Sequence, residues 1–253
     1  NNDLEQFRDF VDDVNRLIVT EQRPVYILTM GDLAWDEYWY KNYFTLNDFV
    51  TEMKDLNTVA FHCIGNHDHD PYCTEDLAAT QQWRDLVMPT YYSFNIGKAH
   101  FVCLDDIAYI NNGGAVGTIG DKSYKNYVTE DQLAWLRKDL ALVEDRTAPL
   151  FVLVHAPLAY PNASFGNTYY DEARAGQLLD CFEGFSEVHV LSGHSHDNRN
   201  CQLTDAVIDH NPGAVCACWW WSGVYADRHI CKDGTPGGYG VYELEGKDLT
   251  WYY

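Results

Sequence analysis

The stretch TVAFHCIGNHD, residues 58–68, places a run of apolar and β-forming residues directly before Gly65-Asn66-His67-Asp68. An earlier stretch, PVYILTMGD at residues 24–32, has the same form, because its apolar run lacks polar alternation and stops at Gly31-Asp32. Runs of this kind are typical of strands that are buried on both faces of a sheet. We therefore predict two strands, each of which ends at a glycine followed by polar side chains.

Two later apolar runs end in the same way. Residues 150–154 lead directly to His155, and residues 188–191 are followed by Gly193-His194-Ser195-His196. Between the strands, apolar residues recur at helical spacing. These patterns predict helices over 4–18, 46–53 and 171–182 and a further helix that begins with a capping box at Thr129–Gln132.

Strands that alternate with helices indicate a mostly parallel sheet. Two later segments, however, predict antiparallel strands. One is a hairpin over residues 92–105 that turns at Gly97-Lys98, and the other pairs residues 240–244 with 249–253. The expected fold is therefore an α/β protein with mixed sheets.

Composition and charge narrow the class of protein. The chain has 253 residues, of which 46% are hydrophobic, and no Pro-, Gly- or Ser-rich linker divides it, so we predict a single domain over residues 1–253. Its net charge of −21 repels polyanions, which excludes a nucleic-acid groove and favours a small substrate. The longest apolar run, residues 148–160, is shorter than the roughly 18 residues of a membrane-spanning helix.

Five polar side chains fall at the carboxyl ends of the predicted strands, which is where open α/β folds bind ligands. They are Asp32, Asn66, His155, His194 and His196. Three imidazoles, one carboxylate and one amide form a mixed nitrogen and oxygen set that suits Mn, Fe or Zn. Five candidate ligands favour two metal ions, bridged by a carboxylate. Two ions about 3.5 to 4 Å apart clamp a phosphoryl group and generate hydroxide.

In their order and form these motifs resemble those of the calcineurin-like metallophosphoesterase family. The matching residues are Gly31-Asp32, Gly65-Asn66-His67-Asp68, His155 and Gly193-His194-Ser195-His196. The resemblance implies an αββα sandwich in which Asp32 bridges two divalent or trivalent metals. It implies that Asn66, His155 and His194 complete one metal site and that His196 serves the other.

The resemblance also implies a reaction. In it, a metal-bridging hydroxide hydrolyses a phosphomonoester or a phosphodiester. His67 contacts the phosphoryl oxygens or protonates the leaving group, and Asp68 is the partner of His67.

One motif of that family is absent from this sequence. The family begins with Asp-x-His on a first strand, which supplies two ligands to the site of His196, whereas this sequence begins directly in the helix that follows. We therefore expect a domain that is cut after its first strand. The alternative is a non-catalytic metal-binding fragment, in which only the site of Asn66, His155 and His194 is complete.

Cysteines and tryptophans add two weaker expectations. Cys201, Cys216, Cys218 and Cys231 lie near one another in the sequence and allow one or two disulfides, which favours an oxidising compartment. Residues 231–240 resemble segments of extracytoplasmic bacterial members of the family, so we expect a periplasmic or secreted protein. The rings of Trp35, Trp39 and Trp219–Trp221 either border the pocket and stack on a substrate or pack in the core and rim.

Overall fold

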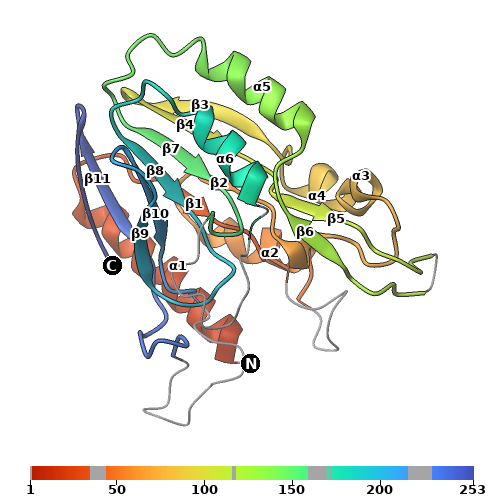
Figure 1. Ribbon diagram of the computed structural model, residues 1–253. Coiled ribbons are helices and arrows are strands. Elements are labelled where there is room, and N and C mark those ends of the chain that lie inside the picture. The colour runs from red at the N-terminus through yellow and green to blue at the C-terminus, as the bar shows by residue number, and fades with distance from the viewer. Residues whose placement is uncertain (1, 35–43, 116–117, 159–169, 171, 216–229) are drawn as a thin grey trace.

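A six-stranded mixed sheet forms the centre of the molecule (Figure 1). The computed structural model describes residues 2–34, 44–115, 118–158, 170, 172–215 and 230–253. The strands lie in the order β3 (Tyr92–Ile96), β4 (Ala99–Cys103), β7 (Leu150–Leu153), β8 (Val188–Leu191), β10 (Val207–Asn211) and β9 (Arg199–Gln202). The four central strands are parallel, and β3 and β9 are antiparallel edge strands. The predicted alternation therefore produces a parallel core with antiparallel additions.

Two helices cover one face of this sheet, α5 (Glu130–Leu140) and α6 (Glu172–Asp180) (Figure 1). Leu133, Leu136 and Leu140 repeat at helical spacing on α5, and they pack with Leu178 of α6 against the valines of the sheet. Strands β4, β7 and β8 are buried along their whole length. Burial on both faces explains why their sequences show no polar alternation.

The other face of the sheet packs on two small sheets. One pairs β1 (Ile27–Thr29) in parallel with β2 (Ala60–His62), and the other is the hairpin of β11 (Val241–Glu245) and β12 (Asp248–Tyr252). A row of stacked aromatic rings crosses from β2 through β3 and β4 to β7, with ring centroids 3.7 to 5.0 Å apart; it consists of Phe61, Phe94, Phe101 and Phe151. The described strands give β1 a partner along one edge, which is β2.

Helix α1 (Asn2–Thr20) lies outside this second layer, and α2 (Leu46–Glu52) packs beside it through a contact between Phe7 and Phe49. Helices outside two packed layers of strands form the expected αββα sandwich, so the predicted α/β fold with mixed sheets is confirmed. The predicted strands are found at their expected places, although two of them are shorter than predicted. The 188–191 strand is found with those bounds, and the 58–64 and 24–30 runs contain the shorter strands β2 and β1.

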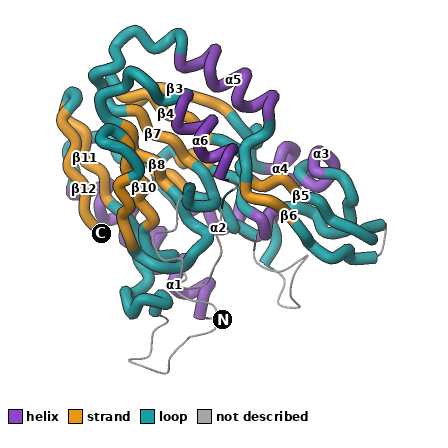
Figure 2. The backbone as a smooth tube through the Cα atoms, in the orientation of Figure 1, coloured by secondary structure: helices purple, strands orange, loops and turns teal. Residues whose placement is uncertain are grey.

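Several short elements were not predicted. They are the 3-10 turns at Met53–Asp55 and Asn66–Asp68, α3 (Asp76–Ala79), α4 (Gln81–Leu86), and the antiparallel pair of β5 (Ile107–Tyr109) and β6 (Tyr124–Asn126). Figure 2 shows α3, α4, β5 and β6 gathered at one end of the central sheet, joined by long loops. Elements of three to six residues carry too few side chains for a periodic pattern.

The capping box predicted at Thr129 is only half formed, which corrects the prediction. The Thr129 hydroxyl accepts from the backbone N–H of Gln132 and from the Gln132 side-chain amide, both at 3.4 Å, but the Gln132 side chain makes its other hydrogen bonds outside the cap. Its oxygen accepts from the backbone N–H of Asp105, and its amide donates to the Asp105 carbonyl, so tertiary hydrogen bonds replace the second half of the box. A complete capping box forms at Thr45, with Asp48.

Some expectations fall on residues outside the described part of the chain. These are the roles of the five tryptophans at 35, 39 and 219–221, and any disulfide through Cys216 or Cys218. Cys201 is a free thiol. Among the described helices, none is both long and apolar enough to cross a membrane.

Candidate metal centre

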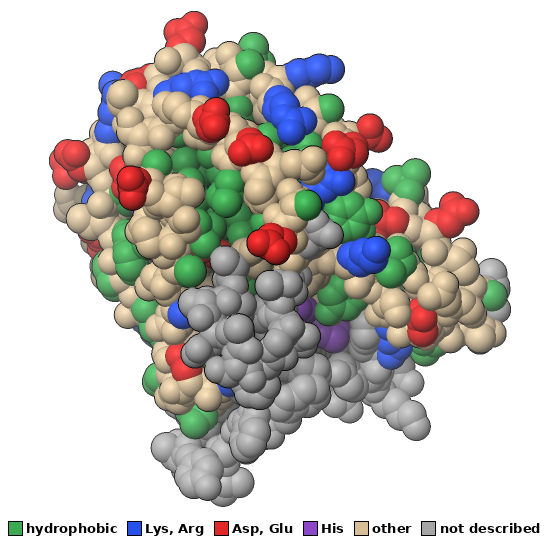
Figure 3. Space-filling view, viewed as in Figure 1, with side chains coloured by type: hydrophobic (Ala, Val, Ile, Leu, Met, Phe, Trp, Pro, Cys, Tyr) green, Lys and Arg blue, Asp and Glu red, His purple; other side chains and the backbone are tan. Residues whose placement is uncertain are grey.

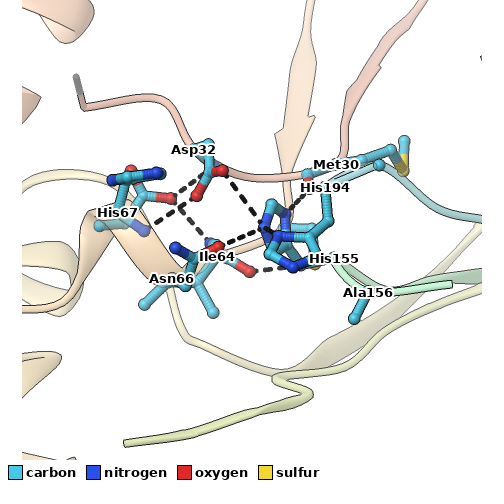
Figure 4. Close-up of polar contacts among 12 residues, drawn as sticks. Met30, Asp32, Ile64, Asn66, His67, His155, Ala156 and His194 are labelled. Atoms are coloured by element: carbon cyan, nitrogen blue, oxygen red, sulfur yellow. Dashed lines mark hydrogen bonds and ion pairs between the residues drawn. The ribbon is translucent and has the colours of Figure 1, made fainter. Parts of the chain in front are cut away.

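Four loops meet at the carboxyl ends of β1, β2, β7 and β8, and each brings one of the predicted ligands (Figure 4). The Nε2 atom of His155 lies 2.9 Å from Oδ1 of Asn66 and 3.1 Å from Nδ1 of His194. It also lies 3.3 Å from Oδ2 of Asp32. The ligand atoms of Asp32, His155 and His194 all lie within 4.8 Å of one another. The structure therefore brings four of the five predicted ligands to one point.

His155 is held rigidly. Its Nδ1–H donates to the Met30 carbonyl at 2.5 Å, so Nε2 is the atom that faces the other ligands. The backbone N–H groups of His155 and Ala156 donate to the two oxygens of Asp106 at 2.8 and 2.9 Å. A histidine whose second nitrogen is fixed in this way has the tautomer and orientation of a metal ligand.

Asp32, His194 and His196 have φ angles of 57°, 64° and 53°. Within the described residues, Lys122 is the one other non-glycine residue with positive φ. This left-handed conformation is uncommon for residues with a Cβ atom, and such strain concentrates at functional sites. The backbone of both ligand loops is thus bent to aim these side chains.

Two glycines allow the Asp32 and Asn66 loops to approach each other. A Cβ atom on Gly31 would lie 2.7 Å from the backbone of Gly65, and one on Gly65 would lie 2.3 Å from the Asp32 nitrogen. Gly31 also has a φ of 90°, which favours glycine. These close approaches explain the glycines that follow strands β1 and β2.

Asp68 joins the same two loops. Its Oδ2 accepts from the backbone N–H groups of Asp32 and Gly65, and its Oδ1 accepts from that of Ala34. The sequence predicted Asp68 as the partner of His67. The contacts instead show a carboxylate that positions the Asp32 loop, and a pairing with His67 stays a prediction.

His67 lies beside the ligands. It is 9% exposed, and its backbone N–H donates to Oδ1 of Asp32 at 2.9 Å (Figure 4). Burial lowers the pKa of the His67 imidazole, although the Asp32 carboxylate opposes this shift. The neutral form that results carries one N–H, which is suited to donate to an anionic oxygen.

The electrostatics of the ligands are strongly coupled. Burial disfavours charge on Asp32, but the imidazoles of His155 and His67 hold the pKa of its carboxyl well below the usual range. Burial likewise opposes charge on His155, yet Asp32 raises the pKa of His155 to about 9. Burial and the neighbouring His155 lower the pKa of His194 to about 3.

These contacts fit a bound cation. Three acceptor atoms surround the Nε2 atom of His155: Oδ1 of Asn66, Nδ1 of His194 and Oδ2 of Asp32. A single proton on Nε2 cannot form good hydrogen bonds to all three, so lone pairs are left facing this point. A divalent ion there would replace that proton and would be bound by imidazole nitrogens and side-chain oxygens, the donor set that Mn, Fe and Zn accept. The residues therefore fit a metal ion.

His196 was predicted as a ligand of a second metal. It lines the same cavity as Asp32, His155 and His194, but it does not belong to the triad that those three residues form. The cavity has a volume of about 1000 Å³ and extends between α1 and the sheets, with walls that are mostly apolar. Figure 3 shows a histidine surface in a recess of the molecule, bordered by hydrophobic side chains.

Sequence reasoning missed the residues that support the ligand loops. Asp106 supports His155, and Asn211 of β10 donates to the Gly193 carbonyl while its Oδ1 accepts from Ser195. Asp209, also on β10, accepts from the Ser192 hydroxyl at 2.6 Å. The sequence does contain a signal for Asp106, because two acidic residues, Asp105 and Asp106, come shortly after the buried strand β4. The polar residues of β10 form no local pattern that would predict their role.

Fold and site together define a class of protein, an α/β sandwich whose strand-end loops gather Asp, Asn and His around one cation site. The chain belongs to the calcineurin-like phosphoesterase family, which matches residues 2–198. Residues 209–253 match the C-terminal region of calcineurin-like phosphoesterases. The protein is accordingly a phosphoesterase hydrolase of a family that uses divalent metal ions.

Solved structures with the same fold have low sequence identity to this chain. A dimetal phosphatase from Danio rerio is 15% identical with a TM-score of 0.55, and the match covers 85% of this chain and 79% of that one. GAP50, the anchor in the inner membrane complex of Plasmodium, is 15% identical with a TM-score of 0.54 and coverages of 99% and 77%.

PhoD is 13% identical with a TM-score of 0.52, and the match covers 80% of this chain and 53% of PhoD. This chain therefore spans about half the length of PhoD. At such identities these likenesses show the fold alone. Comparison with curated proteins gave no match.

Proposed function

We propose that this protein hydrolyses a small phosphomonoester or phosphodiester with the help of metal ions held at the candidate centre. The observation that carries the proposal is the meeting of Asp32, Asn66, His155 and His194 around one point, beside a cavity that Asp32, His155 and His194 line. A metal ion bound there supplies positive charge to phosphoryl oxygens and makes water a better nucleophile near neutral pH. The net charge of −21 supports a small substrate rather than a long polyanion.

His67 has a distinct part in this proposal. Its buried, neutral imidazole lies beside Asp32 and can donate its N–H to a phosphoryl oxygen. A bound phosphate brings negative charge, which favours the protonated imidazole and so the transfer of a proton to the leaving oxygen. Asp68 fixes the Asp32 loop, and through it the distance between Asp32 and His67.

A dinuclear centre is the finer part of the proposal. The described ligands form one triad, and His196 lies on the same cavity wall with its backbone bent in the left-handed region. The second ion would bind between Asp32 and His196, as the sequence predicted.

Metal content and turnover test the proposal together. We expect about two equivalents of Mn per chain after incubation with Mn²⁺ and exhaustive dialysis, and turnover of p-nitrophenyl phosphate or its diester. The Asp32→Asn and His194→Gln variants should lose both metal and turnover, whereas Asp205→Asn, an exposed carboxylate in a turn, should retain both. One equivalent would refute the dinuclear centre, and a folded protein that binds no metal would refute the site.

A non-catalytic role is the second candidate. One observation favours it, since GAP50 shares the fold over 99% of this chain and is described as an anchor. In that case the protein would bind metal at the triad and show no turnover of either ester. Turnover that is lost in Asp32→Asn excludes this role.

An extracytoplasmic location is also proposed. Because Cys201 is a free thiol, the support for it comes from the close spacing of Cys216, Cys218 and Cys231 in the sequence. Disulfide mapping by mass spectrometry, on protein purified without reductant, tests it. Fully reduced cysteines would contradict it.

A further inference from the structure

Two buried cysteines meet between the two layers of strands. Cys63 directly follows β2 in the small sheet, and Cys103 is the last residue of β4 in the central sheet. Neither side chain is exposed to solvent, and both are free thiols in the structure. Both belong to the apolar cluster that joins the two layers. The pair therefore lies where one bond would connect the layers.

The contacts of the two thiols cross from one layer to the other. The Sγ atom of Cys63 lies 3.3 Å from the carbonyl oxygen of Leu104, the residue that follows Cys103. The Sγ atom of Cys103 lies 3.5 Å from the carbonyl oxygen of His62, the residue that precedes Cys63. Each sulfur thus reaches the backbone beside the other cysteine, so the two side chains lie side by side.

The environment of the pair limits when it can react. Burial raises the pKa of the Cys63 thiol, and a hydrogen bond with the Cys103 side chain raises it further. A buried thiol with a raised pKa carries little thiolate, which is the form that attacks a disulfide. Oxidation of this pair therefore belongs to the folding chain, before the two layers close over it. A disulfide formed at that stage is shielded from reductants in the folded protein.

Both cysteines are close in sequence to residues of the candidate metal centre. Cys63 comes three positions before Asn66, and Cys103 comes three positions before Asp106. The carboxylate of Asp106 accepts from the backbone N–H of His155. A bond between the two sulfurs would therefore join the segment that carries Asn66 to the segment that positions His155.

We propose that Cys63 and Cys103 form a disulfide that joins the end of β2 to the end of β4 and fixes these two segments of the metal centre relative to each other. The oxidant is a small-molecule or protein disulfide, which accepts two electrons from the two thiols. An S–S bond forms between Cys63 and Cys103 while the S–S bond of the oxidant breaks, and the two protons pass to its sulfurs, which leave as thiols. The sulfurs of the pair approach from contact to about 2 Å. The pairing itself does not depend on the proposed hydrolysis.

Oxidative refolding followed by disulfide mapping tests the pairing. The full chain is refolded from denaturant with reduced and oxidised glutathione, the remaining thiols are alkylated, and the peptides are mapped by mass spectrometry without reductant. We expect one pair of peptides linked through Cys63 and Cys103. Recovery of both as alkylated thiols from folded protein would show two cysteines that pack as small hydrophobes, and it would overturn the proposal. A link from either one to a different cysteine would overturn it as well.

Thermal unfolding measures the effect of the bond on stability. The disulfide would close a loop of about 40 residues, so the melting temperature of the oxidised wild type should be about 10 °C above that of the reduced protein. In Cys63→Ala, reductant should lower the melting temperature by about 10 °C less than in the wild type. Cys181→Ala is the matched control, because Cys181 packs on the opposite face of the central sheet, and it should respond as the wild type does. An equal effect of reductant on Cys63→Ala and the wild type would overturn the proposal.

Calorimetric titration with Mn²⁺ tests the effect on the metal centre, and this part rests on the proposed function. We expect the oxidised wild type to bind Mn²⁺ about 10-fold more tightly than the reduced protein, as when the support of a metal ligand is gained. Equal affinities in the two states would refute the role of the bond in fixing the ligand segments. Absence of Mn²⁺ binding in both states would refute the candidate centre instead, because the mapping result needs no metal.

Discussion

Replacement of Gly65 by alanine tests whether close contact between two loops builds the metal centre. Gly65 has φ −116° and ψ 177°, an extended conformation that alanine adopts freely, so the backbone itself is not strained by the change. The added Cβ atom, however, would lie 2.3 Å from the nitrogen of Asp32 and 2.4 Å from its Oδ1. It would also lie 2.9 Å from Cε1 of His155. The methyl group therefore enters the contact between two of the candidate metal ligands, Asp32 and His155.

The required movement can be worked from these distances. Ordinary contact begins at 3.4 Å, so the Asp32 loop must move by 3.4 − 2.3 = 1.1 Å. Overpacking of this kind costs about 1 to 3 kcal/mol of stability. Displacement of a ligand by about 1 Å lowers catalytic rates by roughly 100-fold. We expect metal affinity to fall by about 10- to 100-fold, as it does when the support of a ligand is lost.

The assay measures three quantities on Gly65→Ala, namely the free energy of unfolding in urea, Mn²⁺ affinity by calorimetry and turnover of a phosphoester. Gly176→Ala is the matched control, because its Cβ atom would meet nothing within 4 Å and it lies inside helix α6. It should gain about 1 kcal/mol of stability from helix propensity and keep its metal affinity. Wild-type metal affinity and stability in Gly65→Ala would refute the account of the loop contact.

Two further predictions concern stability and support of the ligands. Burial lowers the pKa of His62 to about 4, against about 6.5 when unfolded, so the unfolded chain binds the extra proton as pH falls. The free energy of unfolding should decrease between pH 6.5 and pH 4, and His62 should account for about 3 kcal/mol of that decrease. In urea unfolding, His62→Gln should therefore show a shallower dependence of this free energy on pH than the wild type. Equal dependence on pH in the two proteins would contradict this. Asp106→Asn leaves one acceptor for the backbone N–H groups of His155 and Ala156. The free energy of unfolding of this variant should be about 1 to 3 kcal/mol lower than that of the wild type, and its Mn²⁺ affinity should be weaker. An unchanged Mn²⁺ affinity in calorimetry would show that Asp106 does not orient His155.

Local sequence patterns predicted the main strands of this protein and the positions of the polar residues that follow them. The apolar run before His155 and the one before Gly193 predicted strands β7 and β8, because burial on both faces removes polar alternation from a strand. The position of a polar residue directly after such a strand also placed it at one edge of the sheet, where parallel strands end together. Asp32, Asn66, His155 and His194 were found from sequence for this reason.

Tertiary structure decided how those residues are held. Gln132 breaks the predicted capping box because a distant partner, the backbone of Asp105, competes for its side chain. The carboxylate of Asp68 turns to three backbone amides, two of them from a loop 34 to 36 positions earlier in the chain. Asn111 donates to the carbonyls of Pro71 and Cys73, which lie 40 and 38 positions earlier in the chain, and accepts from the backbone N–H of Lys122. Each of these arrangements depends on contacts between segments far apart in sequence. The sequence alone therefore predicts the candidate ligands, while packing sets their geometry.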